Sequence, residues 1–162
     1  MKRNIPRNIL LAEDNDDDAF LTQRALEAGG ISEPIHRCRD GQDVIEYLDR
    51  FCSGKGTSAN ALPPDLVLLD LKMPRLDGME TLKWIRRHEI FHSMIVLALT
   101  SSNEKRDVET AYRLHINAYL VKPSSLSEMV GIARTLREFW MDQKHLLMPQ
   151  FDFPFGRDVA RS

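Results

Sequence analysis

Acidic residues directly follow two apolar runs of the chain, and their positions suggest a site for a cation and a phosphoryl group. Glu13 and Asp14 follow the run at residues 9–12, and Asp70 follows the run at residues 66–69. If these runs are neighbouring buried strands of a parallel sheet, the three carboxylates converge at one edge of it. Their mutual repulsion must then be relieved by protonation or by a bound cation. The cluster therefore suits a divalent metal ion.

A hydroxyl group and an ammonium group follow two further apolar runs. Thr100 comes directly after residues 95–99, and Lys122 comes directly after residues 119–121. Together with the three acids, these residues offer a nucleophile, a metal cage, a donor for a phosphoryl oxygen and a cation that offsets its charge. Phosphoryl transfer to a carboxylate requires this set of groups.

Other polar residues nearby have simpler interpretations. For Asp16, Asp17 and Asp18 we expect no part in the chemistry, because acids at the start of a helix are favoured by the helix dipole. Asp77 and Gly78 likewise predict a turn and a helix N-cap.

The elements that must position these groups alternate along the chain. Continuous apolar runs, typical of strands buried on both faces, lie near residues 8–12, 66–69, 95–99 and 119–121. The alternating run at residues 35–38 indicates an edge strand. Helix-length segments with apolar residues at helical spacing lie at residues 21–28, 45–52, 79–85, 108–115 and 129–140. Five strand–helix repeats predict an α/β fold, a five-stranded parallel sheet with helices on both faces.

Composition narrows the class of protein. A chain of 162 residues with 43% hydrophobic and 28% charged residues is typical of one ordinary soluble domain. Its net charge of -2 argues against a nucleic-acid partner, and no run is long enough for a membrane or secretory segment, so we expect a cytoplasmic protein. Cys38 and Cys52 lie in no CxxC spacing, which argues against a disulfide framework or a zinc site.

The chain resembles the receiver domain of two-component response regulators. The motifs that carry the resemblance are Glu13-Asp14, Asp70-Leu71-Lys72-Met73-Pro74, Asp77-Gly78, Thr100-Ser101 and Lys122-Pro123. The resemblance extends over about residues 7–142. It implies a flavodoxin-like sheet with strand order 2-1-3-4-5, and we expect a receiver domain at residues 1–142.

The resemblance also implies a role for each acid of the cluster. Asp70 is similar to the phospho-acceptor, which attacks the phosphohistidine of a sensor histidine kinase. Glu13, Asp14, Asp70 and the backbone carbonyl of Lys72 are similar to the ligands of Mg²⁺ or another divalent cation. A phosphate adds about -1.5 to -2 of charge to an already acidic pocket, so we expect strict Mg²⁺ dependence. Such a protein accepts a phosphoryl group and loses it slowly, and is not a multiple-turnover enzyme.

Three further residues resemble the family's switch. Thr100 is similar to the switch hydroxyl, and Tyr119 is similar to the switch aromatic that turns inward after phosphorylation. Lys122 is similar to the lysine that pairs with the phosphoryl group, and the family holds the Lys122-Pro123 bond cis.

A narrower resemblance, to regulators paired with bacterial phytochrome kinases, rests on Glu138-Phe139-Trp140, the Leu-Met-Pro that follows, and an enlarged loop after the second helix. It implies a homodimer across the face formed by the helix at 108–115, the strand at 119–121 and the helix at 129–140. We expect residues 143–162 to be a C-terminal extension that acts as a dimerisation arm, with residues 147–155 docked on the partner and with no output domain.

Two other functions remain as alternatives. A Mg²⁺-dependent phosphatase of the haloacid-dehalogenase type also begins with an aspartate after a buried strand. It carries a second aspartate as general acid where this chain has Lys72. An interaction module that is never phosphorylated could keep the fold, but the complete set of acceptor, metal and switch residues argues against it.

Overall fold

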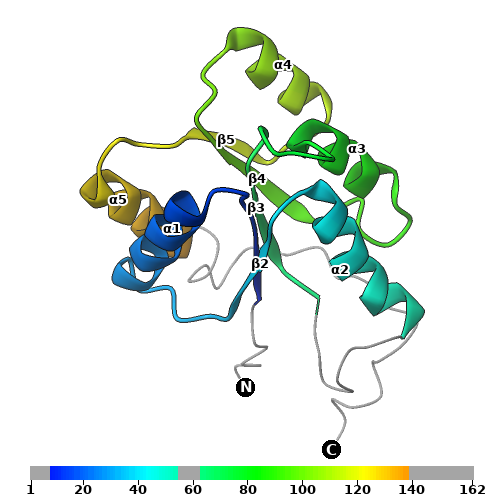
Figure 1. The fold of residues 1–162 in the computed structure, drawn as a ribbon, viewed down its shortest axis with the longest axis horizontal. Helices are drawn as coiled ribbons and strands as arrows, with labels where there is room; N and C mark the ends of the chain where they lie inside the picture. The colour runs from blue at the N-terminus through cyan, green and yellow to red at the C-terminus, as the bar shows by residue number, and fades with distance from the viewer. Residues whose placement is uncertain (1–7, 55–62, 139–162) are drawn as a thin grey trace, which may run out of the picture.

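The structure is a computed structural model that describes residues 8–54 and 63–138. Strands and helices alternate along this part of the chain (Figure 1). The strands are β1 (Ile9–Ala12), β2 (Ile35–Cys38), β3 (Leu66–Leu69), β4 (Ile95–Thr100) and β5 (Ala118–Val121). The helices are α1 (Asp16–Ala28), α2 (Gly41–Ser53), α3 (Gly78–Arg87), α4 (Lys105–Arg113) and α5 (Leu126–Leu136).

The strands form one parallel sheet in the order β2-β1-β3-β4-β5, which confirms the predicted order 2-1-3-4-5. Every residue of β1, β3 and β4 is buried, as their continuous apolar sequences predict. The expectation that residues 119–121 are buried on both faces was wrong, although the predicted order correctly places β5 at the edge of the sheet. Its residues are only partly buried, and Val121 is 44% exposed.

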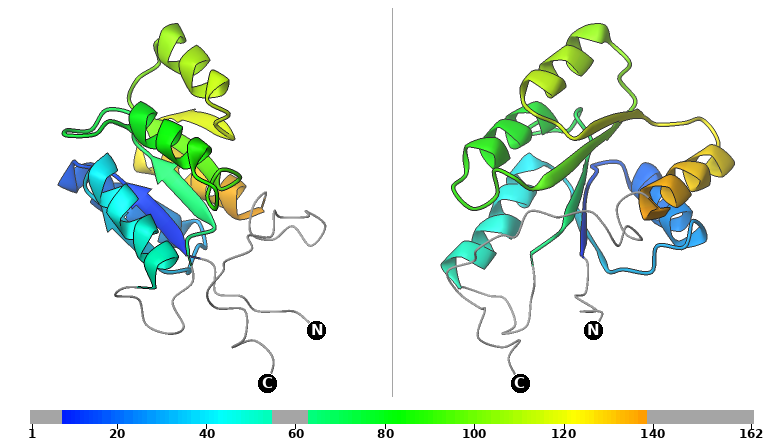
Figure 2. Two further views of the ribbon diagram at one scale, coloured as in Figure 1. Left: turned by 90° about the vertical axis from the view of Figure 1, so that its right-hand side faces the viewer. Right: turned by 180° about the vertical axis from the view of Figure 1, so that it is seen from behind.

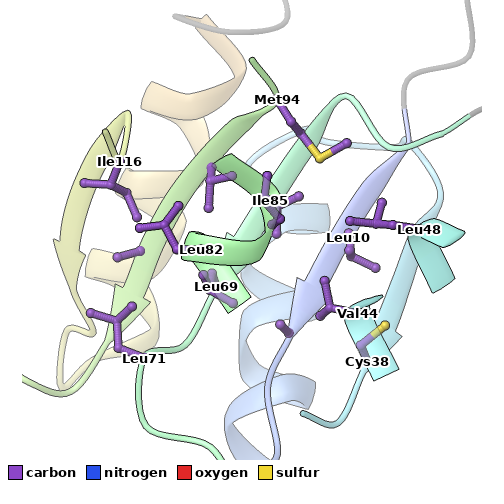
Figure 3. Packing of buried hydrophobic residues seen from close by; sticks show 14 of the residues in the cluster. Leu10, Cys38, Val44, Leu48, Leu69, Leu71, Leu82, Ile85, Met94 and Ile116 are labelled. Atoms are coloured by element: carbon purple, nitrogen blue, oxygen red, sulfur yellow. The ribbon is translucent and has the colours of Figure 1, made fainter. Parts of the chain in front are cut away.

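Helices cover both faces of the sheet, and each face has its own hydrophobic core (Figure 2). On one face, Leu10 and Leu69 of the sheet pack with Val44 of α2 and with Leu82 and Ile85 of α3 (Figure 3). On the other face, α1 and α5 pack together over the alternate side chains of the same strands. Successive strand residues thus point to opposite cores, which fixes the register that brings the strand ends into line.

Side-chain caps set where several helices begin. Asn15, Asp40, Asp77 and Ser125 each accept a hydrogen bond from the backbone N–H three residues later. The expected cap at Asp77 is therefore confirmed. Within residues 8–54 and 63–138, none of the helices has the length and apolar character that a membrane crossing needs.

Candidate metal and phosphoryl site

The carboxyl ends of β1, β3 and β5 bring the predicted charged residues together. The Asp70 N–H donates to the Ala12 carbonyl at 3.0 Å, which holds the end of β3 beside the end of β1. The Lys122 N–H donates to the Thr100 carbonyl at 2.8 Å, which holds the end of β5 beside the end of β4. The side chains that follow these strands therefore share one edge of the sheet.

The three acids form a cluster that could hold a metal ion. One carboxylate oxygen from each of Glu13, Asp14 and Asp70 lies within 4.8 Å of the others. Glu13 and Asp70 are buried, with 2% and 5% of their surface exposed, whereas Asp14 is exposed. Hard oxygen ligands open to water on one side match the preference of Mg²⁺, which keeps part of its hydration shell. The residues present thus fit a divalent cation.

Lys122 brings a cation into this cluster. Its Nζ contacts Glu13 Oε2 and lies 3.1 Å from Asp70 Oδ2 and 2.9 Å from Asp18 Oδ2. Burial would lower the pKa of the Lys122 ammonium, but the hydrogen bonds with Glu13 and Asp18 and the charge of Asp70 raise it above its ordinary value. Lys122 is therefore charged across the physiological range.

Asp18 was missed by the sequence reasoning, which assigned it to a solvated helix start. Its contact with Lys122 shows that the expectation was wrong for Asp18, because the first turn of α1 points this side chain toward the end of β5. No local pattern indicates this contact, because Asp18 and Lys122 lie 104 residues apart in the sequence.

The environment of Glu13 disfavours its charged form. Burial raises the pKa of the Glu13 carboxyl, and the hydrogen bonds from Lys122 and from the Asn15 N–H offset this only in part. The charge of Asp70 raises the pKa further. The repulsion expected from the sequence is therefore present, and a cation bound here would relieve it.

Arg37 of β2 and Arg39, which follows this strand, hold the loop that carries Glu13 and Asp14. Arg37 donates from Nε to the Glu13 carbonyl at 3.0 Å and from Nη2 to the Asp14 carbonyl at 3.1 Å. Both Arg37 and Arg39 pair with Asp16, at 2.7 and 2.8 Å, and lower the pKa of that carboxyl. Asp16 therefore fixes the loop by ion pairs with Arg37 and Arg39, while its backbone begins α1.

The loop from β3 to α3 passes very close to Asp70. The Lys72 N–H donates to Asp70 Oδ1 at 3.0 Å, which orients the carboxylate. Gly78 leaves no room for a side chain, because an added Cβ would lie 2.3 Å from the Asp70 carbonyl oxygen. Arg75 adopts a positive φ of 60° in this loop and pairs with Asp40 and Asp43 at the start of α2. These contacts fix the path of the segment that contains the Lys72 carbonyl.

Thr100 and Tyr119 lie on β4 and β5 behind the charged cluster. Thr100 is fully buried at the end of β4, and the Tyr119 hydroxyl donates to the Ser102 carbonyl at 2.8 Å. The Ser102 hydroxyl donates to Asp107, which also pairs with Lys72 at 3.0 Å. Tyr119 is thus connected to the acceptor loop through the start of α4. The Lys122-Pro123 bond, whose isomer the sequence left open, is trans, unlike the cis bond of the family.

A second group of potential ligands, Asp49, Cys52 and His88, fits a metal less well. Burial raises the pKa of the Cys52 thiol, and the charge of Asp49 raises it further, so the thiol is protonated at neutral pH. The Ile90 N–H donates to Nδ1 of His88, which occupies that nitrogen. The cluster at the carboxyl ends of the strands is therefore the better metal site.

Comparison with known proteins connects this site to a family. The sequence profile described as the response regulator receiver domain matches residues 9–134. The probable methanogenesis regulatory protein FilR2 of Methanothrix harundinacea is 39% identical over 136 residues, which are 84% of this chain and 84% of that protein. Response regulator Rcp1 of Synechocystis sp. is 33% identical over 139 residues, which are 86% of this chain and 92% of that protein.

Solved structures agree with the sequence matches. The crystal structure of the Mn²⁺-bound form of Rcp1 superposes with a TM-score of 0.75 at 32% identity, over 90% of this chain and 100% of that chain. The crystal structure of the phosphorylated cyanobacterial phytochrome response regulator RcpA superposes with a TM-score of 0.72 at 34% identity, over 84% of this chain and 94% of that chain.

Proposed function

Because the chain belongs to the response regulator receiver domain family, we propose that Asp70 is the residue that receives the phosphoryl group. The chain is a phospho-acceptor of two-component signalling, as its relatives among the phytochrome response regulators indicate. One observation carries the assignment to Asp70. This buried carboxylate belongs to a cluster that could hold a metal and also contacts the ammonium group of Lys122.

The proposed transfer uses groups that already lie close together. An oxygen of Asp70 bonds to phosphorus while the bond between phosphorus and the histidine nitrogen of the kinase breaks. Lys122, with Nζ 3.1 Å from Asp70 Oδ2, pairs with the transferred group. The Thr100 hydroxyl moves toward the phosphoryl group and donates a hydrogen bond to one of its oxygens. The Tyr119 ring then turns inward.

Receiver domains bind divalent cations, and the Rcp1 structure holds Mn²⁺. In this chain we propose Mg²⁺, held by Glu13, Asp14, Asp70 and the Lys72 carbonyl, with water on the exposed side of Asp14. When bound, the ion offsets the charge of the incoming phosphoryl group, which the three acids would otherwise repel. Lys72 thus has two parts in the proposed site. Its backbone N–H orients the Asp70 carboxylate, and its backbone carbonyl is a proposed ligand of the ion.

We further propose that the chain is not a multiple-turnover enzyme. A phosphatase of the haloacid-dehalogenase type needs a general acid two residues after its nucleophile, and this chain has Lys72 there. The Lys72 side chain pairs with Asp107, which raises the pKa of its ammonium further. A group that holds its proton so firmly is a poor general acid.

The proposed phosphodonor is a sensor histidine kinase of the bacterial phytochrome type. The support is the likeness to RcpA and to a regulator described as acting in red light signalling of R. palustris, which is 30% identical with a TM-score of 0.74. Because such kinases make phosphohistidine from ATP inside the cell, the proposed location is the cytoplasm.

The proposed signal is a change in the surface formed by α4, β5 and α5, and the same surface is the proposed homodimer interface. Tyr112, Val121 and Leu126 are large apolar residues that are 50%, 44% and 50% exposed on these elements, and they would be buried by a second copy. The proposed arm at residues 143–162 lies outside the described residues. Removal of the residues after Lys144 should convert the dimer to a monomer in light scattering, and an unchanged dimer would exclude a role for the arm.

Labelling with a small phosphodonor tests the assignment of Asp70. With acetyl phosphate and Mg²⁺, the intact mass of the wild-type protein should increase by one phosphoryl group, and Asp70→Asn should show no increase. Asp17→Asn is the matched control, because it removes an exposed carboxylate in the first turn of α1. A chelator should abolish labelling of the wild type. Full labelling of Asp70→Asn, or labelling that persists in chelator, would contradict the proposal.

A further inference from the structure

We propose that Asp18 is a positioning residue for Lys122, which keeps the ammonium group at the edge of the pocket when a divalent cation enters. The proposal rests on the function proposed above and adds a residue that lies outside the metal cluster. Asp18 contacts neither the acceptor nor the cluster in the contacts described, but its Oδ2 lies 2.9 Å from Nζ of Lys122.

Three carboxylates share the ammonium group of Lys122. Its partners are Glu13, Asp18 and Asp70, of which Glu13 and Asp70 also belong to the cluster that could hold a metal. When a cation binds to those two carboxylates, their contacts with the ammonium group weaken. Asp18 is then the partner that remains to Lys122.

Asp18 differs from the other two partners in its exposure. The side chain of Asp18 is 45% exposed, whereas those of Glu13 and Asp70 are 2% and 6% exposed. A carboxylate in contact with water keeps its charge without a large desolvation penalty. The Lys122 ammonium group can therefore shift toward Asp18 and remain at the edge of the pocket. The Asp18 N–H donates a hydrogen bond of 2.9 Å to Oδ1 of Asn15, and this bond fixes the first turn of α1.

The consequence is an effect on cation affinity. Without the Asp18 carboxylate, Lys122 has Glu13 and Asp70 as its partners, and an entering cation must compete with the ammonium group for both. When the Asp18 carboxylate is present, a small shift of the flexible Lys122 side chain toward it relieves this competition. Loss of the Asp18 carboxylate should therefore weaken Mg²⁺ binding, by way of Lys122.

Calorimetric titration of Mg²⁺ into the unphosphorylated protein tests this inference without an activity measurement. Asp18→Asn should raise the Kd for Mg²⁺ by about two- to fivefold, the range of a partly exposed ion pair. Asp17→Asn removes the same charge one residue away on the exposed side of α1 and should change the Kd by less than about twofold. Asp18→Glu, which keeps the carboxylate, should restore most of the lost affinity.

A Lys122→Met background shows whether Asp18 acts through Lys122. There, Asp18→Asn should raise the Kd no more than Asp17→Asn does, because the ammonium group that it positions is gone. An equal increase in both backgrounds would overturn the inference, and so would equal effects of Asp18→Asn and Asp17→Asn in the wild type. Failure of the proposed function would be seen in a different measurement. The wild type would then take up no phosphoryl group from acetyl phosphate, whatever the Mg²⁺ affinities of the variants.

Discussion

Lys122 Nζ lies 3.1 Å from Asp70 Oδ2, so the ammonium group after β5 reaches across the end of β4 to the carboxylate after β3. The side chain of Lys122 is only 11% exposed, and that of Asp70 is 6% exposed. The contact therefore lies inside the protein and exists before a phosphoryl group arrives. The charge of Lys122 therefore stabilises the unphosphorylated protein and also takes part in the proposed reaction.

Lys122→Met should make the protein less stable and more dependent on Mg²⁺. It leaves Glu13 and Asp70 buried without their cation, which should lower the free energy of unfolding by about 3 kcal/mol at neutral pH. Millimolar Mg²⁺ should recover much of this loss. Urea unfolding with and without Mg²⁺ measures both effects. Lys83→Met is the control, because its pair with Glu80 is on the surface and should contribute less than about 1 kcal/mol.

Gly78→Ala should disturb the site although it changes no charge. The added Cβ would lie 2.3 Å from the Asp70 carbonyl oxygen and 2.6 Å from Leu71 Cα, so backbone atoms must move. We expect a loss of about 1–3 kcal/mol in the free energy of unfolding and at least a tenfold slower labelling by acetyl phosphate. Gly131→Ala, in α5, meets nothing within 4 Å and should be neutral or stabilising. Equal effects at the two glycines would contradict the close approach.

Asp40 should make stability depend on pH in the acid range. Burial would raise the pKa of its carboxyl, but the hydrogen bonds from the Asp43 N–H and from Arg75 outweigh burial and hold the pKa below the ordinary 3.8. The folded state therefore binds the proton more weakly than the unfolded state does. The ionised carboxylate stabilises the fold above about pH 4, and this contribution is lost as the pH falls through the folded-state pKa.

Unfolding of the wild type and of Asp40→Asn should be compared from neutral pH down to about pH 3. The difference in free energy should be largest at neutral pH and should shrink as the pH falls below about 4. Arg75→Met should narrow the same difference, because Arg75 is the cation that pairs with Asp40. A difference that stays constant with pH would contradict a lowered pKa of the Asp40 carboxyl in the folded state.

The sequence was sufficient for the architecture and for the meeting of the charged groups. Apolar runs of three to five residues predict buried strands, and parallel strands place whatever follows them at one edge. The strand order that brings Glu13, Asp70 and Lys122 together is what the resemblance to receiver domains implies. The burial of β5 could not be predicted in this way. A short apolar run looks the same in a central strand and in an edge strand, and Val121 is exposed because no strand lies beyond it in the sheet.

The contacts that sequence reasoning missed lie where loops and helix starts meet. The sequence shows three successive aspartates at residues 16–18, yet Asp16 pairs with Arg37 and Arg39, whereas Asp18 pairs with Lys122. The rotation of the first helical turn separates them, and that rotation depends on where Asn15 caps the helix. The pairing of Arg75 with Asp40 joins two loops 35 residues apart, and no local pattern indicates it.

Tyr119→Phe tests the proposed switch in its resting position. The Tyr119 hydroxyl donates to the Ser102 carbonyl at 2.8 Å, and the Ser102 hydroxyl donates to Asp107 at 2.6 Å. If the ring turns inward after phosphorylation, the hydrogen bond to Ser102 must break. Removal of the hydroxyl should then destabilise the unphosphorylated form by about 1 kcal/mol and leave the phosphorylated form unchanged.

The equilibrium should consequently shift about fivefold toward the phosphorylated conformation in Tyr119→Phe. Urea unfolding with and without beryllium trifluoride, which replaces the labile phosphoryl group, measures the two stabilities. Tyr112→Phe is the control, because Tyr112 is half exposed on α4 and should lose little in either state. If Tyr119→Phe loses the same free energy in both states, the hydrogen bond survives phosphorylation. The ring would then be a fixed part of the packing between β5 and α4, and the signal would have to leave the site by another path, through Lys72 and Asp107.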